Sequence, residues 1–151
     1  MRLLGRMMPA RPPGWVSAIL EWRWISLLAR IALTSAYIVG GLAKLFDFSA
    51  AVAEQQHFGF HPGWIWAVLA IVIELLGPVL IISGRWVWLG AGALGVLTAI
   101  ASLAADNFWD FEGHARFVAL NSFFEHFGLI AGLVLAAVMA ESNQRRPLRL
   151  N

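Results

Sequence analysis

Glu74 lies in the middle of a long apolar run of this 151-residue chain, and Lys44 lies near the end of an earlier apolar run. A carboxylate among apolar groups is costly unless it is protonated or paired with a cation. A buried Glu74–Lys44 pair would either fix the register of two helices or handle protons at a binding site. The sequence leaves both interpretations of this pair open.

A later apolar run contains a second polar cluster. On a helix Asn121 and Glu125 lie one turn apart on the same face, whereas His126 points about 100° away from Glu125. Histidine can exchange protons at physiological pH, so His126 could move protons with Glu125, although a hydrogen bond to a neighbouring helix is the favoured interpretation. We expect one outward-facing polar pocket, in which Glu74 and Glu125 share a proton. Its expected lining is Lys44, Glu74, Asn121, Glu125 and His126.

The remaining residue types exclude several kinds of chemistry. The chain has no cysteine, so it forms no disulfide and holds no cysteine-ligated zinc or iron–sulfur cluster by itself. Histidines and carboxylates also occur in the connections, where carboxylates are usually solvated. We therefore expect no metal and no intrinsic cofactor. The net charge of +2 is small, and we expect no nucleic-acid partner.

Four apolar runs must position these side chains. Hydrophobic residues make up 60% of the chain and charged residues only 13%, which is too few to cover a soluble domain. Each run has about the 20 residues that a helix needs to cross the hydrocarbon core of a bilayer. The predicted transmembrane helices are 25–46, 64–83, 87–105 and 117–140.

Short connections between these runs predict an all-α, up-down four-helix bundle in the membrane. Residues 1–24 would form a basic N-terminal segment, 25–140 the transmembrane domain, and 141–151 a basic tail. Basic residues concentrate on one side of this topology, which predicts that both termini are cytoplasmic. These residues are Arg2, Arg6, Arg11, Arg23, Arg85, Arg145, Arg146 and Arg149.

Small residues recur at helical spacing inside the runs and predict close helix contacts. Gly128 and Gly132 also form a GxxxG pattern, for which packing within the molecule is favoured over a dimer face. The oligomeric state is left open. The expected packing residues are Gly41, Gly77, Pro78, Gly95, Gly128 and Gly132.

Four segments share a common resemblance. They are ARIALTSAYIVGGLAKLFDF (29–48), ELLG (74–77), FWDFEGHA (108–115) and LIAGL (129–133). In this order and spacing they resemble the DoxX family of small four-helix membrane proteins, over roughly residues 29–140. Among the candidate residues, the resemblance carries over Gly41, Lys44, Glu74 and Gly77. The chain departs from it in the last helix, where many relatives have Lys-Asn in place of Glu125-His126.

The DoxX resemblance implies a role beside redox enzymes. Some members are subunits of thiosulfate:quinone oxidoreductase, and others are linked to membrane assemblies with superoxide dismutase and a sulfurtransferase. By this resemblance the chain would be an accessory subunit of a membrane redox or oxidative-stress system in the bacterial inner membrane. Lys44, Asn121 and His126 would hydrogen-bond a quinone, Glu74 or Glu125 would handle protons, and a redox-protein partner would supply electrons.

Two alternatives from other classes stay open. The first is a small solute transporter or permease, which would use Lys44 and Glu74 as a gate or proton relay. The second is a structural assembly or membrane-anchor protein, in which the polar cluster only holds the helices together. The lipid bilayer is the expected surrounding in every case.

Overall fold

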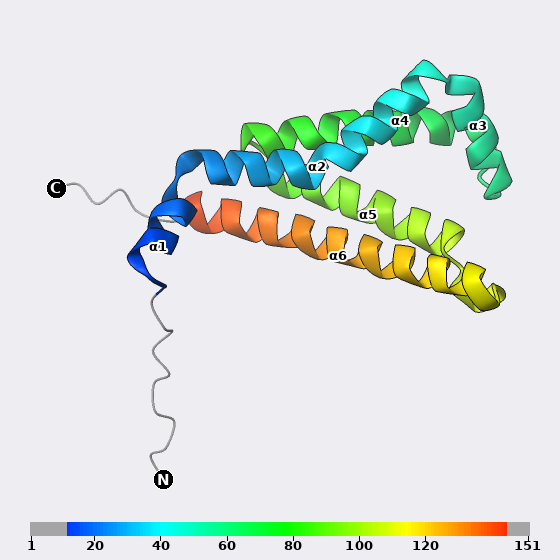
Figure 1. Ribbon diagram of the computed structural model, residues 1–151. Helices are drawn as coiled ribbons and strands as arrows, with labels where there is room; N and C mark the ends of the chain where they lie inside the picture. The colour runs from blue at the N-terminus through cyan, green and yellow to red at the C-terminus, as the bar shows by residue number, and fades with distance from the viewer. Residues whose placement is uncertain (1–11, 145–151) are drawn as a thin grey trace, which may run out of the picture.

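The computed structural model describes residues 12–144, and this part of the chain is helical without any β-strand. The all-α prediction is therefore confirmed for the described residues. Residues 1–11 and 145–151, which belong to the two predicted basic flanking segments, lie outside the description. The helices are α1 (Gly14–Glu21), α2 (Arg23–Phe46), α3 (Phe48–His57), α4 (Gly63–Ser83), α5 (Val87–Ala105) and α6 (Gly113–Gln144), with a short 3-10 turn η1 (Phe108–Asp110) before α6 (Figure 1).

Four of these helices, α2, α4, α5 and α6, are long and apolar enough to cross a membrane. The α5 bounds agree with the predicted range, while α6 extends beyond the predicted 117–140 at both ends. The first connection between the long helices is also helical, because α3 follows α2 after a single residue, Asp47. The prediction of four membrane-spanning helices is therefore confirmed by length and composition.

The long helices lie side by side in chain order. Helix α2 packs against α4, α4 against α5, and α5 against α6, whereas α2 touches α6 only slightly. Figure 1 shows that α2 begins and α6 ends at one end of the molecule, which we call the terminal end. Helix α3 lies against α4 at the opposite end, which we call the α3 end.

Small residues let α4 and α5 approach each other closely near the terminal end. A Cβ atom on Gly77 would lie 2.7 Å from Cγ of Leu94, and one on Gly90 would lie 2.7 Å from the Gly77 carbonyl oxygen. The same Gly90 position faces Ile81. Residues later in α4 thus contact residues earlier in α5, so these two helices pack in opposite directions.

The turn between α4 and α5 is held by a glycine and an arginine. Gly84 ends α4 with a φ of 74°, a left-handed conformation in which a side chain would be strained. Arg30 of α2 donates from Nη1 to the carbonyl oxygen of Ile81 at 3.3 Å, which satisfies one of the free carbonyls of the last helical turn. Helix α2 is thereby fastened to the terminal end of α4.

The core is narrow, and it joins α2 to the other three long helices. Tyr37 hydroxyl lies 2.7 Å from Oγ1 of Thr98, which also donates to the Leu94 carbonyl oxygen. Ile81, Leu94 and Leu133 are fully buried around this contact. Most other large apolar side chains point outward, as expected when lipid rather than water surrounds the helices.

Candidate functional site

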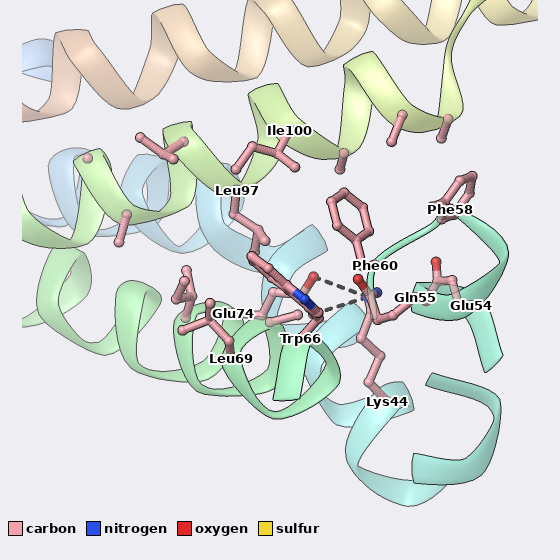
Figure 2. Close-up of a pocket in the computed structure, with 18 of the residues that line it drawn as sticks. Lys44, Glu54, Gln55, Phe58, Phe60, Trp66, Leu69, Glu74, Leu97 and Ile100 are labelled. Atoms are coloured by element: carbon pink, nitrogen blue, oxygen red, sulfur yellow. Dashed lines mark hydrogen bonds and ion pairs between the residues drawn. The ribbon is translucent and has the colours of Figure 1, made fainter. Parts of the chain in front are cut away.

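The structure confirms the predicted contact between Lys44 and Glu74. Nζ of Lys44, in the last turn of α2, lies 3.1 Å from Oε1 and 3.2 Å from Oε2 of Glu74 in α4 (Figure 2). The two side chains are 21% and 12% exposed, so the pair is mostly removed from the surroundings. Gly41 permits this approach, because a Cβ there would already lie 3.0 Å from Cβ of Glu74.

A cavity of about 510 Å³ adjoins this pair between α4 and α5. Its size is in the range of pockets that hold organic ligands. The walls are mostly apolar, and Figure 2 shows Leu69, Leu97 and Ile100 among the side chains around it. Lys44 is the α2 residue that lines it, and α3 with the following connection adds the remaining wall. The cavity is therefore an apolar space with one polar region.

Helix α3 contributes polar groups that sequence reasoning missed. Glu54 and Gln55 line the cavity together with Lys44 and Glu74. The polar region then contains one ammonium group and two carboxylates. The sequence held one signal for these two residues. A helix that begins after Asp47 places Glu54 and Gln55 two turns beyond the end of α2.

Aromatic side chains border the same cavity, and these were also missed. The rings of Phe60 and Trp66 lie with their centroids 5.3 Å apart at an angle of 44°. Both residues line the cavity, as does Phe58 (Figure 2). Flat aromatic side chains beside a donor and two carboxylates suit a planar ligand with polar atoms at its edge.

Asp47 determines where α3 begins and hence where Glu54 lies. One of its carboxylate oxygens, Oδ1, accepts hydrogen bonds from the Ala50 backbone N–H at 3.0 Å and from the Ser49 hydroxyl at 2.9 Å. These hydrogen bonds favour the charged form and lower the pKa of Asp47 below its usual value. A capping aspartate in this position satisfies one of the free N–H groups of the first helical turn.

The structure does not bring Asn121 and Glu125 into this cavity, and that part of the predicted pocket is wrong. Both residues are exposed on α6, and neither lines the cavity. The cause is the packing of α6, which lies against α5 and barely touches α2. Glu74 and Glu125 therefore have no common site in which to share a proton.

His126 also lies outside the cavity, in a separate polar contact. Its Nδ1 lies 2.7 Å from Oδ2 of Asp106, which accepts a hydrogen bond from the Ser102 hydroxyl at 3.0 Å. Asp106 is buried at the end of α5. The favoured hydrogen-bond interpretation of His126 is thus confirmed. Asp106 was not predicted as the partner of His126. The one signal for it in the sequence is Ser102, which lies one helical turn before it.

The same contact shows where Glu125 lies along α5. Because His126 meets Asp106, the residue that follows α5, the part of α6 before His126 extends past the end of α5. Glu125 therefore lies level with the end of α5.

The predicted packing residues divide into two groups. Gly41 and Gly77 lie at close helix contacts, Pro78 is fully buried, and a Cβ on Gly132 would lie 3.0 Å from Cδ1 of Leu33. Gly95 and Gly128 have open space where a Cβ would be, so close packing at these two positions is not found. A small residue can face the lipid at no cost in free energy, so the spacing of glycines alone does not distinguish those at helix contacts from those that face lipid.

Comparison with known proteins decides the family. The DoxX family model matches residues 25–107, which is more than half of the chain. The chain belongs to the DoxX family. The match includes Lys44, Glu74 and the cavity-lining part of α5, and it ends before α6.

A relative supports the same assignment. The inner membrane protein YphA of Escherichia coli (strain K12) is 24% identical over 112 residues, which cover 74% of this chain and 80% of that protein. No solved structure matches the chain. With four apolar helices, this DoxX-family chain is a multi-pass membrane protein in contact with the lipid bilayer. The expected inner-membrane localisation agrees with both comparisons.

Proposed function

We propose that this DoxX-family protein is a quinone-binding accessory subunit of a redox or oxidative-stress system in the bacterial inner membrane. The observation that carries the proposal is the apolar cavity beside the Lys44–Glu74 pair. A quinone has the matching chemistry, since its ring is apolar and planar while its two oxygens accept hydrogen bonds. A second redox protein supplies the electrons.

The residues of the cavity have separate roles in this proposal. The Lys44 ammonium has three donors, of which Glu74 does not use all, and it donates to one quinone oxygen. Full reduction of the quinone takes up two electrons and two protons, and Glu74 accepts a hydrogen bond from a hydroxyl of the resulting quinol. Phe60 and Trp66 enclose the faces of the ring.

We propose that the α3 end faces the periplasm and that both termini are cytoplasmic, in an up-down bundle. The described part of the chain places Arg23 and Arg85 in the segments at the terminal end, and the α3 end has the acidic residues Asp47, Glu54 and Asp106. Basic residues favour the cytoplasmic side of short connections. The cavity then draws protons from the periplasmic side.

The mostly apolar cavity wall argues for a quinone over a polar solute as the ligand. A transported polar molecule would need several hydrogen-bonding partners, and the charged groups lie only in the half of the cavity nearer the α3 end. A purely structural role for the Lys44–Glu74 pair predicts no ligand at all. Binding measurements therefore separate these alternatives.

The test is titration of the purified protein in lipid nanodiscs with a short-chain quinone. We expect one saturable site, with affinity lowered at least tenfold in Lys44→Met and at least threefold in Glu74→Gln. Glu125→Gln is the matched control, because it removes a carboxylate outside the cavity, and it should leave the affinity unchanged. Absence of saturable binding, or equal binding by wild type and Lys44→Met, would contradict the proposal.

A further inference from the structure

We propose that the groove along α5, which begins between α4 and α5 beside the Lys44–Glu74 pair, holds the isoprenoid chain of the quinone, and that the ligand enters sideways from the lipid through this groove. The inference rests on the proposed function and specifies its substrate as a long-chain prenylquinone. The ring would lie at the Lys44–Glu74 pair, and the chain would run along α5 toward the terminal end.

The cavity is long and follows the axis of α5. Its α5 wall extends from Trp88 to Ala105. At 1.5 Å per residue this is about 26 Å, or most of the roughly 30 Å thickness of the hydrocarbon core. A ring alone would leave most of this length unfilled.

Part of the groove lies on the terminal side of the polar pair. The contact of Gly77 with Leu94 places Glu74, one turn earlier in α4, beside the α5 turn that contains Leu97. From Leu97 the lining continues to Leu89, a further eight residues or about 12 Å along the helix. The α4 lining ends at Glu74, so α5 forms this stretch. Its side chains from Leu97 to Leu89 are apolar and include Gly92 and Ala93, and Trp88 stands at its end. Small side chains leave room there for a chain.

The groove is open to the lipid along its length. Leu69 of α4 is 44% exposed, and Val96 of α5 is 62% exposed, although both line the cavity. A Cβ on Gly92 would meet no atom within 4 Å. A molecule dissolved in the bilayer can therefore reach the cavity from the side without passing through water, as an isoprenoid chain requires.

The charge of the polar region selects the head group. Lys44 shares this region with two carboxylates, those of Glu74 and Glu54, so the region has a formal charge of −1 when all three are ionised. An anionic phospholipid head would be repelled, whereas a neutral ring with carbonyl oxygens meets a donor and no net repulsion. The inferred occupant is therefore a prenylquinone, and a bound zwitterionic phospholipid is the outcome that would overturn the inference.

The experiment uses two photoreactive quinones in nanodiscs that contain the full-length protein. One carries a diazirine on the ring, and the other carries it on the isoprenoid chain about 12 Å from the ring, the length given by the helix rise. After illumination, cross-linked peptides are identified by mass spectrometry. Excess unlabelled long-chain quinone is added to a parallel sample, so that specific labelling is recognised by its loss.

We expect the ring probe to label residues around Gln55, Phe60 and Trp66, and the chain probe to label 89–93. In Ala93→Leu the added side chain fills the groove, so labelling of 89–93 by the chain probe should fall at least fivefold while ring labelling persists. Ala99→Leu is the matched control, since Ala99 lies on the same helix but lines the space between α5 and α6. It should change neither pattern.

The two proposals fail in different ways. Ring labelling at Phe60 with chain labelling scattered over α6 would overturn the groove while leaving quinone binding in place. Loss of both specific patterns would overturn the proposed function itself. A phospholipid that stays bound between α4 and α5 and is not displaced by quinone would also overturn the groove assignment.

Discussion

At the scale of single residues, the Lys44–Glu74 pair decides both stability and binding. Two charges removed from water gain from each other only when they meet closely, as the 3.1 Å contact allows. The pair was predictable because an acid inside an apolar run requires a partner. Glu54 and Asp106 were not recognised, because a carboxylate in a connection between apolar runs has the same sequence pattern whether it is solvated or packed.

Removing one partner of the pair should destabilise the protein more than removing both. Glu74→Gln or Lys44→Met leaves an uncompensated charge, and we expect each to lower the free energy of unfolding by about 3–5 kcal/mol. The double variant should lose clearly less than the sum. Unfolding in mild detergent gives the stability of the wild type, the two single variants and the double variant. Additive losses of stability would show that Lys44 and Glu74 are not coupled.

Asp106 should matter for stability although it lies outside the cavity. Asp106→Ala leaves the Ser102 hydroxyl and the His126 ring without their acceptor, so we expect a loss of about 1–3 kcal/mol. Asp110→Ala is the control, because Asp110 is exposed and accepts an exposed hydrogen bond from Asn107. Thermal unfolding of the two variants should differ, and equal midpoints would argue against the role of Asp106.

At the scale of helices, the apolar runs predicted the four spans well, but they did not predict which face of α6 packs. In a soluble protein the polar side of a helix faces water, and the apolar side therefore marks the core. In lipid both sides of a helix can be apolar, and small residues such as Gly128 can face either way. The pattern Asn121, Glu125, Gly128 thus indicated an inner face, while the structure exposes it.

Two glycine-to-alanine substitutions should have opposite effects on stability. In Gly77→Ala the new Cβ lies 2.7 Å from Leu94, and the overpacking should cost about 1–3 kcal/mol. In Gly95→Ala the Cβ meets open space, and the better helix propensity should add up to about 1 kcal/mol. Unfolding curves of the pair check this. A stabilising Gly77→Ala would mean that α4 and α5 are not in close contact.

Helix α3 should lose stability when Asp47 is protonated. The folded-state pKa of Asp47 is lowered, so its contribution is present above the pKa of the unfolded state and is lost as the pH falls through the lowered pKa. Amide hydrogen exchange in α3, corrected for intrinsic rates, should therefore accelerate in acid. Asp47→Asn keeps the cap without titrating and should remove this dependence. An unchanged pH dependence in Asp47→Asn would assign the effect to other groups.

At the scale of the whole molecule, orientation follows from charge rather than from packing. The chain has no native cysteine, so single cysteines at Ser49 and Asn143 report sidedness without background. The outer membrane of the cells is made permeable while the inner membrane stays intact, and a thiol reagent that cannot cross the inner membrane is added. We expect this reagent to label position 49 and not position 143. The reverse pattern would invert the topology and place the cavity opening toward the cytoplasm.

The central claim is that the cavity beside Lys44 and Glu74 holds a quinone. The most direct measurement is extraction of the lipids bound to protein purified in mild detergent from a bacterial host that makes quinones, followed by quantitative mass spectrometry. We predict close to one quinone per wild-type chain, strongly reduced occupancy in Lys44→Met, and unchanged occupancy in Glu125→Gln. Quinone absent from the wild-type protein, or present equally in all three proteins, would contradict the account.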